Sequence, residues 1–353
     1  MTDSDSNSDF NPTSTADPAQ TIPLTKTRRD FIEHKRKTQK QSTARAYKYP
    51  TKSFLQYAKE RDVTVPGDIT RGLVNGWIEQ RQQEVKPVTV HNNAKHIRVF
   101  IKWLAQHDYT DWGIHLKITI PDVPDRGDVN EQIIAADQAE AILEYLGTYH
   151  YATTYHALFK TLWHTGCRIS GALALDVEDF QVNPYGNNSL RFQNRPETDT
   201  PLKNKSKSER EVNISDNLTN ILQDYIDTHR YDVTDEYGRE PLFTTPNGRV
   251  YRQRSYKNIV ALTRPCITSN DCPHDREIDE CEAANDKEKS SMCPSSLAHH
   301  PIRKGAIGNH LNENWTKEVL SERVDVSGDV LEKHYDLRSE ERKRKNRAKY
   351  LHE

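Results

Sequence analysis

The sequence lacks any long apolar segment. No uninterrupted apolar run in its 353 residues approaches the length of about 18 residues that marks a transmembrane helix. The N-terminus begins Met1-Thr-Asp-Ser-Asp and also lacks the apolar core of a secretory signal peptide. We therefore expect neither a membrane span nor a signal peptide, and we expect a cytoplasmic protein.

The chain also lacks a net positive charge, which would be the simplest sign of a nucleic-acid-binding protein. Its formal net charge is −2, but the charges are unevenly distributed along the chain. Residues 26–48 carry nine basic and two acidic side chains, and residues 338–349 carry seven basic and two acidic ones. Residues 1–20 and 271–289 are acidic. The near-neutral total therefore hides basic surfaces suited to DNA, although each block also fits an ordinary solvated helix face.

Composition along the chain predicts two domains. Residues 1–24 are rich in Ser, Thr, Asp and Pro, and we expect a disordered tail there. Residues 25–110 show apolar spacings of a helical period, which predict a domain of short helices. Residues 111–131 contain Pro, Gly and Asp without periodicity and are interpreted as a linker. Residues 132–353 are expected to be mostly helical with a small sheet and a basic C-terminal tail, so the predicted fold class is mainly α with a small β-sheet.

Two arginines, a histidine and a tyrosine have the clearest chemical meaning. Arg168 lies in a Thr-Gly-Cys-Arg turn, His300 and Arg303 form a His-x-x-Arg motif, and Tyr335 follows 32 residues after Arg303. Guanidinium groups bind phosphate oxygens through paired hydrogen bonds, and phosphoryl transfer depends mainly on positioning and on stabilising charge at those oxygens. A tyrosine hydroxyl can be the nucleophile that forms a covalent intermediate. This set is therefore suited to attack on a phosphodiester without a metal.

These motifs, in this order, resemble the tyrosine recombinase (phage integrase) family and look like its archaeal branch. The family's first box reads roughly Thr-Gly-x-Arg-x-x-Glu followed by leucines and an Asp, which corresponds to residues 165–179 here. The second box is His-x-x-Arg, here starting at His300, and the third is a tyrosine on a late helix, here Tyr335. The resemblance spans residues 25–345 of the chain.

The resemblance implies a site-specific DNA recombinase or integrase. Residues 25–110 would be the helical core-binding domain that clamps double-stranded DNA, and residues 132–353 would be the catalytic domain. Tyr335 would form a 3′-phosphotyrosyl link while Arg168 and Arg303 stabilise the developing charge, and the chemistry would need no cofactor. Copies of the chain would assemble into a tetramer on paired sites. The alternatives are a non-catalytic DNA-binding protein on the same fold and a topoisomerase-like DNA-relaxing enzyme.

The family also carries a catalytic lysine on a β-hairpin. Aligning the family's pattern on Arg210 and Val212 places Lys205 at that position. An ammonium group is suited to protonating a departing 5′-oxygen. Lys203 is the alternative for this role, and simple contact of the lysines with backbone phosphate is a third interpretation.

Two positions depart from the family's pattern. Gly171 stands where relatives usually carry Glu or Asp, and we expect Asp176 or Asp179 to supply the missing carboxylate. Val326 stands nine residues before the tyrosine, where relatives usually carry His or Trp. Because valine cannot form a hydrogen bond with phosphate, His334 is the neighbouring side chain considered as its substitute.

Four of the five cysteines fall within residues 266–293, just ahead of the second box. They are Cys266, Cys272, Cys281 and Cys293. Clustered cysteines in a cytosolic protein favour metal binding over disulfides, so we expect a structural zinc, with His274 as a replacement for one thiolate. Four free thiols are the alternative, because no C-x2-C pair is present. Metal binding by His299, His300 and His310 is not expected, since their spacing does not suit shared ligation.

Overall fold

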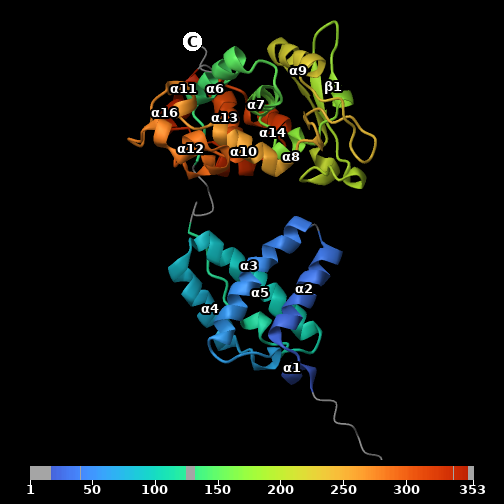
Figure 1. The fold of residues 1–353 in the computed structure, drawn as a ribbon. Coiled ribbons are helices and arrows are strands. Elements are labelled where there is room, and N and C mark those ends of the chain that lie inside the picture. The colour runs from blue at the N-terminus through green and yellow to red at the C-terminus, as the bar shows by residue number, and fades with distance from the viewer. Residues whose placement is uncertain (1–16, 40, 125–131, 337, 349–353) are drawn as a thin grey trace, which may run out of the picture. The chain divides into compact units, whose positions relative to one another are not determined.

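The computed structural model describes residues 17–39, 41–124, 132–336 and 338–348. The chain divides into two compact units, Met1–Val129 and Asn130–Glu353, which are described separately and can be followed by colour in Figure 1. The described chain is mainly α-helical with a small β-sheet, which confirms the predicted fold class. No helix in this part of the chain is both long and apolar enough to cross a membrane.

The N-terminal unit is built from helices. Their bounds are α1 (Pro18–Thr21), α2 (Leu24–Thr38), α3 (Gln41–Lys59), α4 (Arg71–Glu84) and α5 (Pro87–Gln106). Helix α5 starts with a proline, whose fixed φ suits the first helical position. Its apolar side chains recur at a helical period, and Ile97, Phe100 and Ile101 are fully buried in the core of this unit. Burial of this stripe against α2, α3 and α4 explains why these helices pack together.

The disordered tail expected over residues 1–24 is too long. Helix α1 lies within this range, Ala19 is buried, and Leu24 is part of the core of the N-terminal unit. The backbone N–H of Leu24 donates to the carbonyl of Thr64 at 2.8 Å. A few apolar side chains therefore suffice to hold residues 17–24 in place, and the rest of the predicted tail lies outside the described residues.

The linker expected over residues 111–131 is also too long. Ile114 and Ile118 are buried in the core of the N-terminal unit, and Arg98 on α5 donates to the carbonyl of Ile118. This segment includes a short 3₁₀ helix, His115–Lys117, and packs onto α5. Residues 125–131, the remainder of the predicted linker, are outside the described part of the chain.

The C-terminal unit carries more helices and both sheets. Its helices are α6 (Ala136–Tyr149), α7 (Thr154–Thr165), α8 (Ile169–Ala172), α9 (Asp216–Thr228), α10 (Arg252–Leu262), α11 (Cys266–Ser269), α12 (Glu282–Asn285), α13 (His299–Asn312), α14 (Lys317–Val324), α15 (Gly328–His334) and α16 (Glu340–Ala348). Its strands are β1 (Phe180–Gln181), β2 (Ser189–Phe192), β3 (Arg210–Asn213), β4 (Thr244–Thr245) and β5 (Gly248–Arg249). Strands β1, β2 and β3 form an antiparallel sheet in that order, and β4 pairs with β5.

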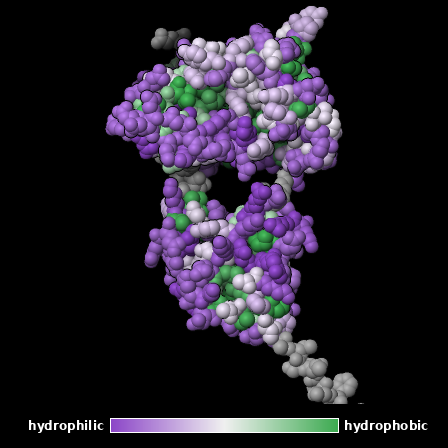
Figure 2. All heavy atoms as spheres, viewed as in Figure 1, coloured by the Kyte–Doolittle hydropathy of each residue, from purple (hydrophilic) through white to green (hydrophobic). Residues whose placement is uncertain are grey.

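Helix α13 runs through the interior of this unit and contacts α6, α7 and α14. Ile302, Ala306 and Ile307 on it are fully buried. A Cβ at Gly305 would lie 2.4 Å from the carbonyl oxygen of Ile134, so this position accepts no side chain. The absence of a side chain therefore lets α13 pack closely against the segment before α6. On the faces seen in Figure 2, both units are mostly hydrophilic, with apolar side chains in separate patches.

Candidate active site

Arg303 and Tyr335 contact each other inside the C-terminal unit. Arg303 lies on the buried helix α13, and its Nε donates to the hydroxyl oxygen of Tyr335 at 3.3 Å. Its two terminal nitrogens donate to the carbonyls of Gly166 (2.6 Å) and Val324 (2.7 Å). Tyr335 caps the C-terminal end of α15 and is only 6% exposed. The three bonds fix the guanidinium plane, and one of them points it at the tyrosine hydroxyl.

Arg168 reaches the same place through a turn that favours glycine. Helix α7 ends at Gly166 with a φ of +61°, in the left-handed region. A Cβ at Gly166 would also lie 3.1 Å from Cγ1 of Val324, which is tighter than an ordinary contact. Burial is the main cause that lowers the pKa of Arg303, and the nearby charge of Arg168 adds to that effect. The two guanidinium groups therefore share one site.

His300 lies beside the tyrosine ring. The two ring centroids are 5.9 Å apart at an interplanar angle of 66°. Burial lowers the pKa of His300 to about 4, and neighbouring cations, including Lys203 and Arg168, act in the same direction. The residue as a whole is nevertheless solvent-exposed, so solvent weakens this shift relative to that of a buried ring such as His299. The imidazole is therefore neutral near pH 7 and can accept a proton.

The adjacent histidines have other partners. His299 is buried, and its Nε2 lies 2.8 Å from the hydroxyl of Ser255. The Nε2 of His310 lies 3.0 Å from the carbonyl oxygen of His164. No group of three side chains of ligand type is arranged to hold a metal within the described residues. His299 and His310 therefore have different surroundings from those of His300.

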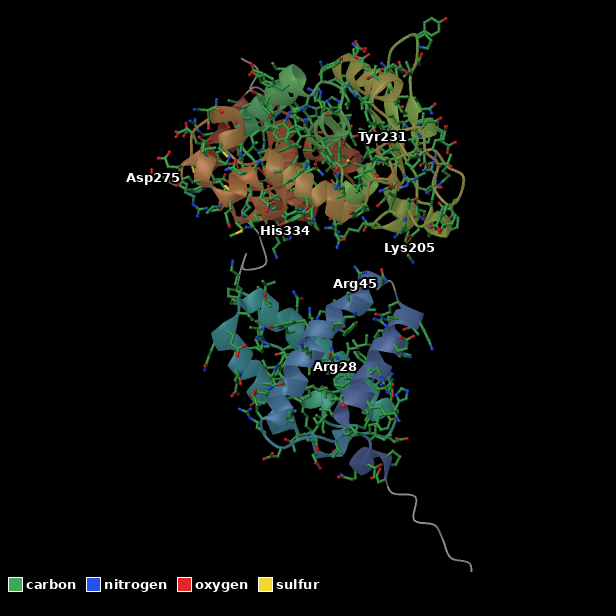
Figure 3. All side chains as sticks on the ribbon, viewed as in Figure 1. Arg28, Arg45, Lys205, Tyr231, Asp275 and His334 are labelled. Atoms are coloured by element: carbon green, nitrogen blue, oxygen red, sulfur yellow. The ribbon has the colours of Figure 1, made fainter. Side chains whose placement is uncertain are left out.

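The lysines of the hairpin lie on the connection between β2 and β3. Lys203 and Lys205 are both exposed, and Lys205 starts a short 3₁₀ helix, Lys205–Ser208, with a φ of +58°. In Figure 3, Lys205 projects from the surface of its unit. Lys203 is among the cations that lower the pKa of His300. Its charge therefore acts on the candidate site, and Lys203 remains the alternative to Lys205.

The carboxylate that meets Arg168 belongs to Asp325, a residue that the sequence did not indicate. Nη1 of Arg168 forms an ion pair with Asp325 at the end of α14. The same carboxylate accepts a hydrogen bond from the hydroxyl of Ser208 (2.7 Å) and from the side-chain amide of Asn204 (3.2 Å). Asp325 thus links Arg168 to the segment that carries the lysines.

The expectation that Asp176 or Asp179 replaces the missing carboxylate is wrong. Asp179 is fully buried and accepts two hydrogen bonds of 2.8 Å from Arg195. Asp176 is held by Arg249 at 2.6 Å and by Arg239 at 3.3 Å. Both carboxylates therefore belong to a separate buried ion network. Gly171, whose missing side chain raised the question, packs near the ring of Phe192.

Val326 forms part of the apolar packing around the tyrosine. It is buried in a small cluster with Val324, Leu331 and Tyr335. The position at which the family usually carries His or Trp therefore presents an apolar surface here. His334, considered as its substitute, is half-buried at the end of α15, and Figure 3 shows it at the edge of the unit.

The four clustered cysteines line one small cavity together with His274. None of the four sulfurs is in a disulfide. Burial raises the pKa of the Cys266 thiol, the charge of Arg264 opposes this, and Cys293 and Cys272 raise it further. The four cysteines that are clustered in the sequence therefore also lie close together in the structure.

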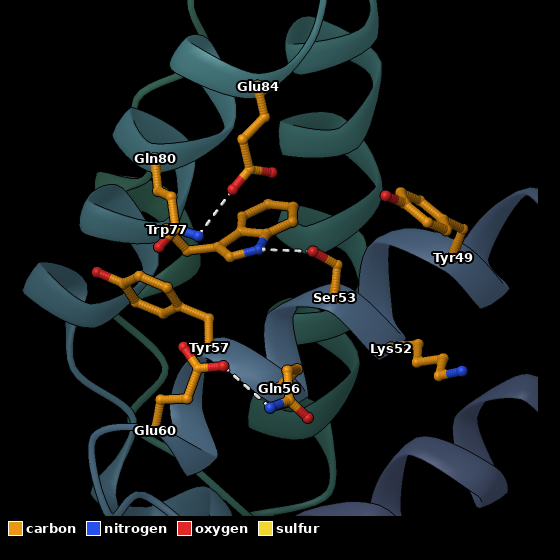
Figure 4. Close-up of a pocket in the computed structure, with 9 residues that line it drawn as sticks. All are labelled: Tyr49, Lys52, Ser53, Gln56, Tyr57, Glu60, Trp77, Gln80 and Glu84. Carbon is orange, nitrogen blue, oxygen red and sulfur yellow. Dashed lines mark hydrogen bonds between the residues drawn. The ribbon is translucent and has the colours of Figure 1, made fainter.

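The N-terminal unit has a hollow between α3 and α4, shown in Figure 4. Trp77 forms its floor and donates from Nε1 to the hydroxyl of Ser53 at 3.2 Å. The charged side chains that line the hollow are two carboxylates, Glu60 and Glu84, and one lysine, Lys52. Its two carboxylates make the hollow unsuited to phosphate, so we assign it no part in the candidate active site.

Known proteins resemble this chain in both sequence and fold. Tyrosine recombinase XerD of Oceanobacillus iheyensis is 26% identical over 230 residues, which cover 63% of this chain and 71% of XerD. The structure of the XerH site-specific recombinase bound to palindromic difH substrate has a TM-score of 0.63 at 13% identity, covering 94% of this chain and 85% of that one. The Tn1549 transposon integrase in complex with transposon right end DNA has a TM-score of 0.59 at 12% identity, with 93% and 99% covered. No family model matches the chain.

The structural similarities show that the chain has the fold of the tyrosine recombinases. The sequence similarity to XerD supports a relationship to that family.

Proposed function

We propose that this protein is a site-specific DNA recombinase that cuts and rejoins DNA through a 3′-phosphotyrosyl intermediate. The observation that carries the proposal is the hydrogen bond from Arg303 to the hydroxyl of Tyr335, with Arg168 and His300 beside it. The geometry joins a nucleophile, two permanent cations and a neutral base. The resemblance to XerD supports the same class of reaction.

In the proposed cleavage step, Oη of Tyr335 attacks the scissile phosphorus and the bond from phosphorus to the 5′-oxygen breaks. The neutral imidazole of His300 accepts the phenolic proton, directly or through water. Arg168 and Arg303 stabilise the negative charge on the non-bridging oxygens, which is where such donors contribute most. Arg303 also stabilises charge on Oη as the proton leaves, because its Nε already donates to that atom.

The departing 5′-oxygen takes a proton from a hairpin lysine, either Lys205, which the alignment indicates, or Lys203, whose charge acts on His300. The 5′-hydroxyl of the partner strand then attacks the phosphotyrosine, which restores the tyrosine and makes a new phosphodiester. One phosphodiester is exchanged for another, so the reaction requires neither ATP nor a catalytic metal.

Asp325 is proposed as a positioning residue. It holds one terminal nitrogen of Arg168 and leaves the other N–H groups of that guanidinium for a phosphate. Through Ser208 and Asn204 it also ties the lysine-bearing segment to the same arginine. In this way it takes the place of the carboxylate that Gly171 lacks.

Double-stranded DNA is the proposed partner, and the N-terminal unit is proposed to contact it through the exposed lysine and arginine side chains of α2 and α3. Strand exchange between two sites calls for a tetramer, one protomer for each of four strand cuts. We assign the archaeal branch on the sequence resemblance alone. A cytoplasmic location fits a protein that acts on DNA.

A non-catalytic DNA-binding protein is the second candidate, and the apolar Val326 in place of His or Trp favours it. A topoisomerase-like enzyme would use the same nucleophile but would relax plasmid that has no target site.

A nicked substrate separates these candidates. Duplexes from the sequences that flank the gene would carry a nick just 3′ of the cut, so that the short fragment bearing the new 5′-hydroxyl diffuses away and religation fails. The recombinase gives a DNA adduct that resists SDS, and Tyr335→Phe gives none while still binding the duplex. Binding without an adduct in the unaltered protein would contradict the proposal and leave the non-catalytic alternative. Relaxation of plasmid without a target site would identify a topoisomerase.

A further inference from the structure

The insert between α10 and α13 contains a cavity built from residues far apart in the insert. Cys266 is on α11, Cys272 and His274 follow in a loop, Cys281 precedes α12, and Cys293 follows the 3₁₀ helix Lys287–Met292. We call this the cysteine cavity. Its ligand-type side chains come from four separate turns of chain, so a bond among them would tie the whole insert together.

The insert has little apolar material to order it. Ile267, Ile278 and Met292 are its large apolar residues between the outer cysteines, and Met292 is 57% exposed. Residues 271–289 hold eight acidic and three basic side chains, so their charges repel one another. Hydrophobic burial therefore contributes little here, and a segment of this kind needs another source of stability.

One polar group at the cavity points to a ligand. Nε2 of His274 is buried and has no hydrogen-bond partner within the described structure. A buried ring nitrogen without a partner is costly, and it is also a good metal ligand. Arg264, the buried cation beside the cavity, is already engaged, because its Nε donates to the carbonyl of Ala261 (2.9 Å) and its Nη1 to the carbonyl of Ala284 (2.7 Å).

We propose that the cysteine cavity binds one zinc ion through the sulfurs of Cys266, Cys272, Cys281 and Cys293. Four thiolates around one ion are a common structural zinc site. In the described residues no three of these side chains are arranged to hold a metal, so the proposed site would require local movement of the ligands. His274 is the ligand that would replace a thiolate, and the experiment below distinguishes the two sets.

Zinc here would act on the proposed catalytic residues only through structure. The 3₁₀ helix Lys287–Met292 packs on α10, and Lys257 of α10 pairs with Glu288. Beyond Cys293, the backbone N–H of Leu297 donates to the hydroxyl of Thr263 (2.7 Å), which donates to the carbonyl of Leu297 (2.9 Å). Helix α13 starts two residues later. The zinc would therefore fix the chain that leads into the second box.

Elemental analysis of the full-length protein, purified under reducing conditions, should find about one zinc per chain. Replacement by cobalt(II) should give the visible absorption of a tetrahedral thiolate complex, whose intensity reports the number of sulfur ligands. Zinc-free protein with four titrating thiols would overturn the proposal. Disulfides, detected as a loss of two hydrogens each by mass spectrometry, would overturn it as well.

Matched variants assign the ligands. Cys281→Ser and Cys293→Ser should each lose most of the zinc, whereas Ser291→Ala, an exposed neighbour, should keep it. His274→Ala should also keep the zinc. If His274→Ala loses the zinc while Cys281→Ser keeps it, a ligand set that includes the histidine would replace the set of four sulfurs. Bound zinc without DNA adducts would contradict the proposed recombinase and leave the metal site standing. DNA adducts formed by zinc-free protein would contradict the metal site and leave the proposed recombinase standing.

Discussion

The surface arginines of α2 in the N-terminal unit and Arg303 in the C-terminal unit are held in opposite ways. In the N-terminal unit, the side chains of Arg29 and Arg36 on α2 are 75% and 52% exposed, and their ion pairs are with neighbours on the same helix. In the C-terminal unit, Arg303 is 2% exposed and donates three hydrogen bonds. Exposed charges attract a polyanion from many directions, whereas a buried and oriented guanidinium acts on one set of oxygens. On the proposed function, the N-terminal unit would mainly supply affinity for DNA, and the C-terminal unit would supply the chemistry.

The hairpin lysine should show the largest effect on chemistry alone. A general acid contributes roughly 10² to 10⁴ in rate, so replacing the true one by alanine should slow adduct formation by that factor and leave the dissociation constant for DNA unchanged. A 5′-bridging phosphorothiolate needs little protonation and should restore the rate. Rescue of Lys203→Ala would assign the role of general acid to Lys203, and rescue of Lys205→Ala would assign it to Lys205. Rescue of neither would remove lysine from the mechanism.

Arg168→Ala and Arg303→Ala come next. Each removes a donor to the phosphate, and such losses cost on the order of 10² to 10³ in rate. Single-turnover adduct formation at saturating DNA measures the effect, and fluorescence anisotropy measures binding. Equal losses in rate and in affinity would break the comparison, because these arginines would then behave like surface cations.

Acid should weaken the C-terminal unit first. His156, His164, His299 and His300 have a pKa of about 4, and burial is the main cause in each case. The unfolded chain, with a histidine pKa of about 6.5, binds more protons between these values, so stability falls as the pH drops from 6.5 towards 4 and no further below it.

For the deeply buried rings of His156 and His299, this loss is on the order of 3 kcal/mol each at most. Thermal unfolding followed at pH 7, 6, 5 and 4 measures the loss, and His156→Gln should flatten the profile. In the N-terminal unit, burial also lowers the pKa of His34 and His96, but without a comparably large shift. If the N-terminal unit lost as much stability in acid, the expected contrast between the two units would be wrong.

Asp325→Asn should have a moderate effect. Asparagine tolerates the left-handed φ of +53° at this position, so the backbone is preserved while the charge is lost. Looser orientation of Arg168 should slow adduct formation about tenfold, the value of one charge-assisted hydrogen bond. Binding should stay constant. Faster cleavage would mean that the carboxylate competes with phosphate for Arg168.

The surface arginines should show the smallest effect for each side chain. Arg36→Ala and Arg45→Ala each remove one exposed cation where α2 ends and α3 begins. Affinity should fall a few-fold, and the slope of log K against log salt should flatten by about 0.9 for each lost phosphate contact. Cleavage at saturating DNA should not change. Lys59→Ala, at the other end of α3, is the matched control and should leave the slope unchanged.

The candidate site residues could be predicted because each lies in a short motif that resembles a box of the tyrosine recombinase family. Arg168 follows a glycine that ends a helix, and His300 and Arg303 share one helix, so these motifs are local in the structure as well. Asp325 was missed because it meets Arg168 across 157 residues and sits at a helix end outside the recognised boxes. No short-range signal marks such a contact. Ile114 and Ile118 were read as a linker because irregular segments bury side chains without periodicity.

Tyr335 is secured to its own chain on both sides. Before it, α15 packs on α14, and after it Asp336 is held by Arg338, which also donates to the carbonyl of Leu311 on α13 at 2.9 Å. Tyr335, Arg168 and Arg303 are therefore brought together by a single polypeptide in this structure. On the proposed function, each protomer would make its own first cut, and two copies with different defects would not complement one another by sharing a tyrosine.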